Sequence, residues 1–397
     1  MVNDVTSWPA ISFESRSWAR NEAAVGSRRQ LRRASGDYHA AIPARIGRAS
    51  VVLEPETLAA ADAASHALAR FDAEAGAVIA PFPAILLRAE SSSSSEVENL
   101  TAGAKQVALA EIGAARSENA RLVVANTRAM DAAIALSTDL DEDALIAMHA
   151  ALLGETAPHF VGQWRQEQVW IGGGAVSPHD ADFVPPHHER VPELMHDLLD
   201  FVDRTDVPLL AQAAIAHAQF ETIHPFPDGN GRTGRALIHA MLHRGGLTRN
   251  LTVPVSAGLL RSPHAYFEAL SDYRDGDVDA IVHAITYASF AAVSNGTRLV
   301  ADINDIRDGW NELVRARTDS SVHRLMDLLL ERPVIRVATA ARFLEVSEVA
   351  AGTAINRLAD SGILTKAAGE NRYRIWQASE VLDALDEFAA RARRDRL

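Results

Sequence analysis

Apolar positions recur every three or four residues along most of the chain, which is the spacing of one face of an α-helix. Ala-rich stretches with good helix propensity repeat this pattern, and several of them open on Ser or Asp residues that can act as N-caps. A mostly α-helical fold is therefore expected. The pattern predicts helices over residues 58–71, 101–111, 118–136, 143–153, 191–203, 209–223, 235–244, 265–274 and 278–295.

Residues 162–186 break this helical pattern. The segment 168–171 reads Gln-Val-Trp-Ile and is rich in strand formers, and three glycines follow at 172–174. The segment 183–186 reads Phe-Val-Pro-Pro and is extended. Because the glycines lie between two extended flanks, the pattern predicts an irregular β-hairpin beside the helical core.

The pattern changes again beyond a polar stretch at 318–321. Helical spacing covers 322–330, 337–344 and 347–360, and Ser347 is expected to cap the third of these helices. A glycine turn and a strand-forming segment at 372–376 follow. Three helices and a hairpin in this order predict a winged helix-turn-helix module.

Composition narrows the class of protein. Of 397 residues, 48% are hydrophobic and 23% are charged, which is typical of a soluble globular chain. The longest apolar stretch, 75–87, contains two prolines and is shorter than the ~20 residues that span a bilayer, and the N-terminus lacks an apolar signal region. Neither a membrane span nor secretion is expected. The chain has no cysteine, so disulfides and cysteine-bound zinc are excluded and a cytoplasmic location is favoured.

The charge distribution bears on nucleic-acid binding. The formal net charge of −13 argues against a broad surface for nucleic acid. In segment 323–374, eight Lys/Arg residues stand against six Asp/Glu, a balance of +2, which is weak for binding DNA. We therefore expect this module to dock protein or to form a homodimer in preference to binding DNA. Near the N-terminus a solvated or partner-facing helix is expected around Arg28, Arg29, Arg32 and Arg33.

The densest chemistry lies between His224 and Arg235, which read His-Pro-Phe-Pro-Asp-Gly-Asn-Gly-Arg-Thr-Gly-Arg. A neutral imidazole can accept a proton at pH 7, a carboxylate at Asp228 suits Mg²⁺, and arginine forks match phosphate. The glycines favour a tight turn with inward N–H groups, and the start of a helix behind them adds positive potential. These parts predict a nucleotide site.

The same run resembles the motif of the Fic (Fic/DOC) family, His-Pro-Phe-x-Asp/Glu-Gly-Asn-Gly-Arg-x-x-Arg, at every defined position. Members are mostly adenylyltransferases that move AMP from ATP onto a Ser, Thr or Tyr hydroxyl of a protein, in some cases the enzyme itself. The resemblance implies that His224 is the general base and that Asp228 holds Mg²⁺ on the α- and β-phosphates. It implies a nucleotide-binding set in which Gly229, Asn230 and Gly231 line the anion hole, Arg232 meets the phosphates, Arg235 reaches the γ-phosphate and Gly234 lies between them.

Gly231 distinguishes two reactions within this family. Doc-type relatives, which transfer phosphate, usually carry Lys at this position. Glycine leaves room for the nucleotide orientation that presents the α-phosphate, so the resemblance favours AMP transfer.

The predicted hairpin resembles the family's flap, which docks the target by strand addition. The residues that resemble it are Gly162, Arg165, the segment 169–173 and the later Phe-Val-Pro-Pro. The resemblance implies target docking along Val169, Trp170, Ile171 and Gly172. The alternative is a solvent-covered hairpin without a docking role.

A serine-rich run at 91–99 ends in a second motif. Ser94, Glu98 and Asn99 resemble the family's inhibitory pattern, Ser/Thr-x-x-x-Glu-Gly/Asn, which lies on a helix. The resemblance implies that Glu98 pairs with Arg235 in cis and keeps the γ-phosphate from seating productively. The alternative is a flexible serine linker.

The resemblance implies a Fic helical core with a β-hairpin flap, over about residues 10–300, followed by a winged-helix domain. The expected division is 1–115 (helical region with the inhibitory motif), 116–300 (catalytic core), 301–320 (connecting helix or linker) and 321–397 (winged helix-turn-helix). Two other functions stay open. One is removal of AMP with Glu98 as a catalytic residue, and the other is a DNA-binding regulator whose nucleotide site acts as a sensor.

Overall fold

The structure, a computed structural model, describes residues 8–18, 34–76, 81–173, 176–314, 320–368 and 374–393. The arginine-rich segment with Arg28 to Arg33 lies outside the described residues. The chain forms two compact units, each assembled from separate stretches of sequence. Unit 1 comprises Met1–Ala63, Asp131–Gly245 and His264–Thr286, and unit 2 comprises Ala64–Met130, Gly246–Pro263 and Tyr287–Leu397.

The fold is mostly helical, as predicted. Residues 209–223 form a helix with the predicted limits, whereas the helix predicted at 235–244 begins earlier, at Asn230. The helices are α2 (Pro55–Gly76), α3 (Phe82–Val97), α4 (Ala104–Glu111), α5 (Glu118–Ala135), α6 (Glu142–Leu153), α7 (Val191–Val202), α8 (Leu209–Ile223), α9 (Asn230–Arg244), α10 (Val255–Leu259), α11 (Pro263–Arg274), α12 (Val278–Leu313), α13 (Ser321–Glu331), α14 (Val337–Leu344), α15 (Glu348–Asp360) and α16 (Ser379–Arg393). The strands are β1 (Ser12–Ser17), β2 (Asp37–Ile42), β3 (Val334–Arg336), β4 (Thr365–Ala368) and β5 (Ile375–Gln377).

Helix α12 is longer than predicted. The pattern predicts a helix that ends at Asn295 and then a connecting helix or linker at 301–320, but a single helix continues to Leu313. Gly296 lies inside this helix, although glycine weakens a helix interior. In unit 2 a Cβ at position 296 would come within 2.9 Å of the Phe71 ring, so glycine is there to let α2 approach. A packing requirement therefore overrides the intrinsic propensity of this residue.

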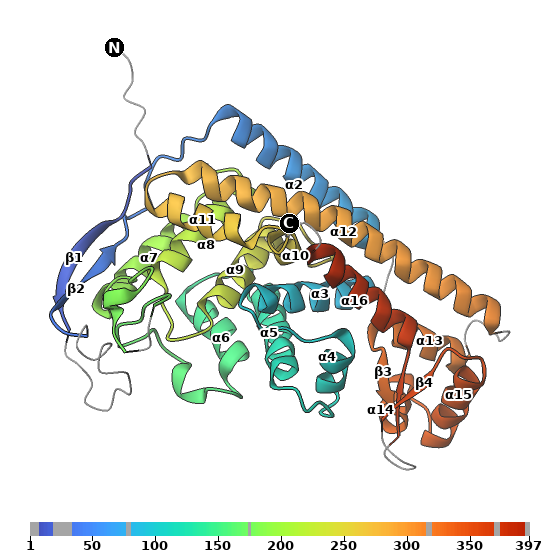
Figure 1. Ribbon diagram of the computed structural model, residues 1–397. Helices are drawn as coiled ribbons and strands as arrows, with labels where there is room; N and C mark the ends of the chain where they lie inside the picture. The colour runs from blue at the N-terminus through green and yellow to red at the C-terminus, as the bar shows by residue number, and fades with distance from the viewer. Residues whose placement is uncertain are drawn as a thin grey trace. The chain divides into compact units, whose positions relative to one another are not determined.

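Unit 1 is built around α8. All residues from Leu210 to Ile223 are buried, which is the pattern of a helix covered on every side. Helices α7 and α9 pack on it, and α6 packs against both of these helices. The antiparallel pair β1–β2, with Ser12 opposite Ile42 and Ser17 opposite Asp37, lies beside α7 (Figure 1).

The hairpin predicted within 162–186 forms only one antiparallel bridge. Ile171 and Phe183 exchange backbone hydrogen bonds at 2.9 and 3.2 Å, and no regular strand forms on either side among the described residues. Prolines at 185 and 186 lack the N–H that a ladder needs, and the carbonyls of this segment bond to side chains instead. We call the part of this segment with Glu167 to Gly172 the inner arm, and the part with Phe183 to Pro186 the outer arm. The outer arm also accepts a hydrogen bond from β2, because the Ala41 N–H donates to the Val184 oxygen at 3.0 Å.

In unit 2 the serine run belongs to helix α3, so the linker alternative is wrong. Ser91, Ser94 and Ser95 are buried. The Ser91 and Ser95 hydroxyls bond to carbonyls four residues earlier, and Asn126 on α5 donates to the Ser91 oxygen at 2.9 Å. Serine has modest helix propensity because its hydroxyl competes for the backbone. Burial of these serines against α5 stabilises the helix and offsets their modest helix propensity.

The C-terminal part of unit 2 has the predicted three helices and hairpin. Ser347 caps α15 by accepting from the Ala350 N–H at 3.2 Å, as expected. The structure adds strand β3, which pairs with β5 to give the sheet order β3-β5-β4, and a final helix, α16, which packs on α3 (Figure 1). Positions 369–373, which include Arg372 of the predicted hairpin, lie outside the described residues.

Candidate active site

The loop between α8 and α9 holds the motif. His224 ends α8 in the left-handed region, with φ 51° and ψ 62°, while its N–H donates to the Phe220 oxygen at 2.8 Å. Positive φ is uncommon for a residue with a side chain. The backbone at His224 must therefore be held by its surroundings, which turns the chain sharply from the end of α8 into the loop.

Asn230 closes this loop with its side chain. Its Oδ1 accepts from the Phe226 N–H, and its Nδ2 donates to the Phe226 oxygen, both at 2.8 Å. Both groups are buried, so each would be costly without a partner. The Asn in the motif is thus explained structurally, in addition to any contact of its backbone with a nucleotide.

His149 on α6 packs against the loop, a contact that was not predicted from the sequence. Its ring stacks on Phe226 with centroids 3.7 Å apart and planes 2° from parallel. Its Nε2 lies 2.9 Å from the Asp228 backbone oxygen. Burial lowers the pKa of His149 to about 4, so the ring is neutral at pH 7 and donates to that oxygen. His149 precedes the motif by 75 positions, and no local pattern connects the two.

The N-terminus of α9 is the electropositive end of the loop. Gly229 takes φ +80°, and a Cβ there would meet Leu152 at 2.9 Å, so glycine is required for both reasons. The first N–H groups of a helix, here from Asn230 through Arg232, have no acceptor within the helix and attract anions. The helix start therefore provides the positive end predicted from sequence.

The charged residues of the motif differ in exposure. Asp228 keeps 62% of its side chain exposed, while Arg232 is 5% exposed and lies 3.8 Å from it. Arg235 is also buried, within α9. A buried guanidinium is held in a defined orientation, whereas an exposed carboxylate keeps coordination sites for a ligand. The difference in exposure is compatible with the predicted roles, in which Asp228 binds a metal ion and Arg232 and Arg235 bind phosphate.

His224 has the protonation state of a base. Nδ1 lies 3.4 Å from the Glu221 backbone oxygen and 3.8 Å from its Oε2. Two acceptors beside Nδ1 favour the tautomer with the proton there, which leaves Nε2 able to accept. Burial and the nearby Arg165 lower the pKa of His224 to about 3, so the ring is neutral at pH 7.

Arg165 is the second supporting residue. It is 3% exposed, and its Nε donates to the His224 oxygen at 2.8 Å. In the sequence Arg165 is part of the flap pattern, and that pattern assigns no chemistry to it. Burial lowers its pKa to about 10, so the guanidinium stays charged at pH 7.

Gly234 and His217 pack α8 against α9. A Cβ on Gly234 would come within 3.0 Å of Glu221, His217 and Phe220, so this glycine lets the two helices approach. His217 is buried with its Nε2 2.8 Å from the Tyr266 hydroxyl. Helix packing is enough to explain Gly234, and its predicted contact with nucleotide stays a prediction.

The four flap residues lie on the inner arm of segment 162–186. Ile171 makes the bridge to Phe183, and Trp170 meets Trp18 edge-to-face with centroids 5.5 Å apart. Gly172 has φ +73°, and a Cβ there would collide with Asp182. Val169 is half-buried. Their role in docking a target stays a prediction.

The second motif ends α3, in unit 2. Asn99, with φ 61°, donates to the Glu96 oxygen at 2.8 Å, and Leu100 donates to the Ser95 oxygen at 3.0 Å. These two bonds form a Schellman C-cap, whose left-handed position favours Gly or Asn. The Gly/Asn of the inhibitory pattern is thereby explained as a helix stop. Ser94 is buried and Glu98 is exposed.

Two further observations concern metal and membrane. The described residues contain no group of three or more His, Cys, Asp or Glu side chains that could hold a metal ion. In the part of the chain that the structure describes, no helix has the length and apolar character to cross a membrane.

Comparison with known proteins shows which family this part of the chain resembles. Residues 139–242 match the family model described as Fic/DOC family. "Protein adenylyltransferase Fic" of Nematostella vectensis is 30% identical over 152 residues, which is 38% of this chain and 32% of that protein. "Probable protein adenylyltransferase aq_aa38" of Aquifex aeolicus is 32% identical over 124 residues, covering 29% of this chain and 36% of that protein. The chain thus spans about a third of the length of these relatives.

A solved structure shares the fold. The crystal structure of a Fic family protein from Desulfovibrio desulfuricans superposes with a TM-score of 0.53 and 20% sequence identity, and the match covers 83% of this chain and 97% of that one. The matched family region contains α6, the Arg165 segment, α8 and most of α9, which are the elements that build the site. Residues 139–242 of this chain are a Fic/DOC family domain.

Proposed function

We propose that the chain transfers AMP from ATP to a hydroxyl group of a protein. The observation that carries the proposal is a neutral His224 with Nε2 free to accept a proton, next to the N-terminus of α9. A base and an anion-binding helix end are the two parts that nucleotidyl transfer to a hydroxyl requires. The names of the relatives, all protein adenylyltransferases, support the same reaction.

In this mechanism His224 Nε2 takes the proton of the target hydroxyl while its oxygen attacks the α-phosphorus in line. The bond to the bridging oxygen breaks, and pyrophosphate leaves with its electron pair. Arg232 and Arg235 hold the phosphates as charge accumulates on the leaving group. Asp228 would hold Mg²⁺, with phosphate oxygens as the other ligands, and the ion would supply further neutralisation of that charge.

We further propose that Glu98 restrains the activity in cis. The proposal rests on the likeness of Ser94, Glu98 and Asn99 to the inhibitory pattern and on their position at a capped helix end. A carboxylate that pairs with Arg235 would compete with phosphate for the same guanidinium fork. Removing the carboxylate should therefore raise the rate without changing the base.

The experiment is AMP incorporation from α-labelled ATP with Mg²⁺, in the presence of a protein lysate. The variants are wild type, Glu98→Gly, and Glu98→Gly combined with His224→Ala. Glu345→Gly is the matched control, because Glu345 is an exposed glutamate in the left-handed region at the end of α14.

Weak label in wild type, strong label in Glu98→Gly and none in the double variant would support both proposals, provided that Glu345→Gly resembles wild type. Equal label in wild type and Glu98→Gly would contradict the proposed restraint by Glu98 but would still support AMP transfer. No label in any variant that binds ATP would contradict AMP transfer to the proteins supplied.

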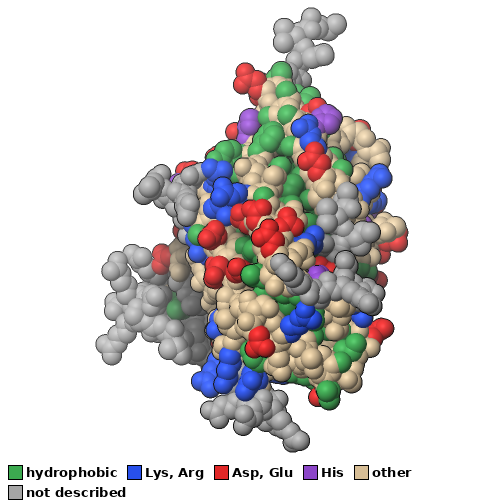
Figure 2. All heavy atoms as spheres, turned by 90° about the vertical axis from the view of Figure 1, so that its right-hand side faces the viewer, with side chains coloured by type: hydrophobic (Ala, Val, Ile, Leu, Met, Phe, Trp, Pro, Cys, Tyr) green, Lys and Arg blue, Asp and Glu red, His purple; other side chains and the backbone are tan. Residues whose placement is uncertain are grey.

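The C-terminal part is proposed to bind protein, a second copy of this chain included, in preference to DNA. Phe343 and Val349 on α14 and α15 are 42% and 81% exposed, and two arginines lie over the Phe343 ring. On the face drawn in Figure 2, acidic and basic side chains are interspersed. Sedimentation of wild type and Val349→Glu tests self-association, and a salt-dependent gel shift with DNA would argue against the proposal.

A further inference from the structure

We propose that Arg165 is the positioning residue of this site, setting the His224 backbone and both arms of segment 162–186 in one geometry. The proposal rests on the proposed function and deepens it. If segment 162–186 docks the target, one side chain determines how the target's hydroxyl lies relative to the base that deprotonates it.

The contacts of Arg165 reach three separate stretches of chain. At the end of α8, Nε donates to the His224 oxygen at 2.8 Å and Nη2 lies 3.4 Å from the Ile223 oxygen. On the inner arm, Nη1 donates to the Glu167 oxygen at 2.9 Å. On the outer arm, Nη2 donates to the Pro186 oxygen at 2.5 Å.

The backbone of Arg165 adds a further link, because its N–H donates to the Pro225 oxygen at 2.9 Å. The residue thus holds the chain immediately before, at and after the catalytic histidine. His224 needs such support, since its left-handed conformation is unfavourable for a residue with a side chain.

The chemistry of this contact set is specific to arginine. Among the described residues, each hydrogen-bond acceptor of its guanidinium is a backbone carbonyl, and none is a carboxylate. Burying a charge without an acid partner is unfavourable. An apolar side chain would fill the space at lower cost, so what Arg165 contributes is its fork of donors.

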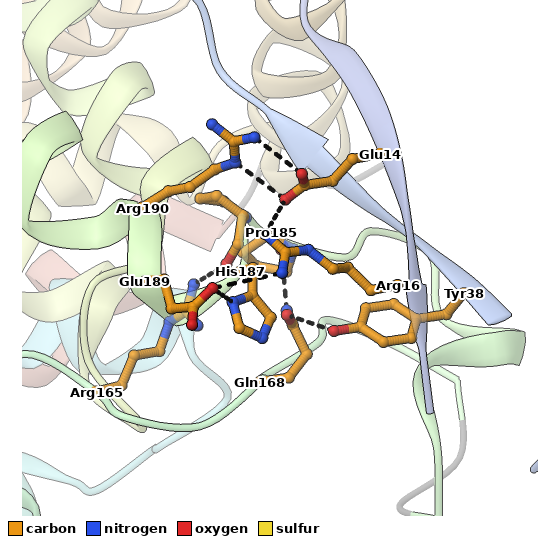
Figure 3. Close-up of polar contacts among 10 residues, drawn as sticks. Glu14, Arg16, Tyr38, Arg165, Gln168, Pro185, His187, Glu189 and Arg190 are labelled. Carbon is orange, nitrogen blue, oxygen red and sulfur yellow. Dashed lines mark hydrogen bonds and ion pairs between the residues drawn. The ribbon is translucent and has the colours of Figure 1, made fainter. Parts of the chain in front are cut away.

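The network continues outward from the flap to the N-terminal hairpin (Figure 3). Gln168 donates to the Pro185 oxygen at 2.9 Å and accepts from the Tyr38 hydroxyl on β2 at 3.0 Å. The Ala41 bond to Val184 adds β2 to the outer arm. Strand β2 of the N-terminal strand pair is therefore bonded to the arm of the flap that contains Val184 and Pro185.

This arrangement has a kinetic consequence. A displacement of about 1 Å between reacting groups can reduce a rate by about a hundredfold. If Arg165 sets the distance between flap and base, its loss changes the chemical step and target binding. Nucleotide binding should be retained, because Asn230 closes the nucleotide loop independently of Arg165.

The test compares Arg165→Lys, which keeps the charge and loses the fork, with Arg165→Met, which keeps much of the volume. Arg204→Lys is the matched control, since Arg204 also donates to a backbone carbonyl, that of Ala49, outside the site. Each variant is prepared in the Glu98→Gly background, and the assay measures kcat, the KM for a target protein, the Kd for ATP and the melting temperature.

Relative to the Glu98→Gly parent, we expect Arg165→Lys to lower kcat by 10- to 100-fold and to raise the target KM several-fold. The ATP Kd should stay within twofold of that of the parent. Arg204→Lys should leave all three unchanged. Wild-type kcat and target KM in Arg165→Lys would overturn the proposal. So would parallel losses of melting temperature and ATP binding, because these would indicate a general structural role.

A second readout does not depend on transfer activity. Removing the guanidinium in Arg165→Met should move the imidazole titration of His224, followed by NMR, to higher pH, and should speed amide exchange at Ile171. If neither wild type nor the Glu98→Gly variant transfers AMP, the proposed function fails and these two readouts still decide the role of Arg165. Unchanged titration and unchanged exchange would contradict it. If Arg165→Met does not fold, Arg165→Lys provides the exchange measurement.

Discussion

Two helix ends carry the two motifs of this chain, and they are built differently. Helix α8 ends at His224 and α3 ends at Asn99, and both residues take positive φ. His224 is largely buried, and side chains from other segments hold the loop that follows it. The end of α3 is formed by backbone bonds within its own last turn, and Glu98 is exposed there.

The difference teaches how one backbone conformation serves two purposes. At His224 the left-handed residue is itself the proposed base, so the surroundings must offset an unfavourable conformation. At Asn99 the left-handed residue is a helix stop whose conformation Asn tolerates, and Glu98, the proposed inhibitory residue, precedes it. Changes at the first end should therefore affect chemistry and stability strongly, and changes at the second should be mild.

The largest expected effect is on chemistry at His224. His224→Ala removes the proton acceptor and should reduce AMP transfer by about 10²- to 10⁴-fold. Measured ATP affinity should stay near wild type, because the proposed phosphate site is the start of α9. Transfer at the wild-type rate would show that another group is the base. The end of α8 would then not differ from the end of α3 by carrying the base.

The second effect concerns pH and the buried histidines around the loop. Burial lowers the pKa of His149 to about 4 and the pKa values of His217 and His224 to about 3, all below the usual 6.5. Between these values and 6.5 the unfolded chain binds more protons than the folded one. Stability is therefore fully present above pH 6.5 and is lost as pH falls, by up to about 1.4 kcal/mol per pH unit for each histidine.

Urea denaturation at pH 7 and pH 5 measures this loss in wild type and in His217→Gln. The variant should lose less stability between the two pH values than wild type does. His264→Gln, which changes an exposed histidine, serves as the control and should behave like wild type. A wild-type protein equally stable at both pH values would contradict neutral burial of these rings.

The third effect concerns stability: a change in the loop after His224 should cost more free energy of unfolding than a change at the end of α3. Asn230→Ala leaves the N–H and the carbonyl of Phe226 without their partners, which should cost about 3 kcal/mol in the free energy of unfolding. Asn230→Asp is the informative companion, because it keeps an acceptor for the N–H and loses the donor. Denaturant midpoints measure both, and a loss under 1 kcal/mol in Asn230→Ala would indicate that the loop does not depend on this clamp.

The smallest effect is expected at Asn99. Asn99→Ala places a residue that disfavours positive φ at the end of α3 and should cost about 1 kcal/mol. Asn99→Gly should be neutral or slightly stabilising. The two variants differ only in conformational preference, so equal stabilities would mean that the left-handed cap contributes nothing.

Local patterns predicted those parts of the molecule whose interactions lie close in sequence. Helix α8 was predicted with its observed limits, and Ser347 was predicted as the cap of α15. The serine helix α3 was left open between helix and linker, because serine propensity is ambiguous and the deciding contact with Asn126 lies 31 to 35 positions away. The flap was predicted as a hairpin, whereas its prolines and side-chain bonds leave a single bridge.

The sequence by itself determined the chemical groups of the site and their order, from His224 to Arg235, because this motif is continuous and each residue type has a narrow chemical use. It also determined the helical character of the fold through periodicity. Only the tertiary structure decided the protonation state of His224, the stacking of His149 on Phe226 and the four-carbonyl contact of Arg165. The physical reason is that burial and backbone acceptors come from segments far apart in the chain, and no local pattern encodes which of them meet.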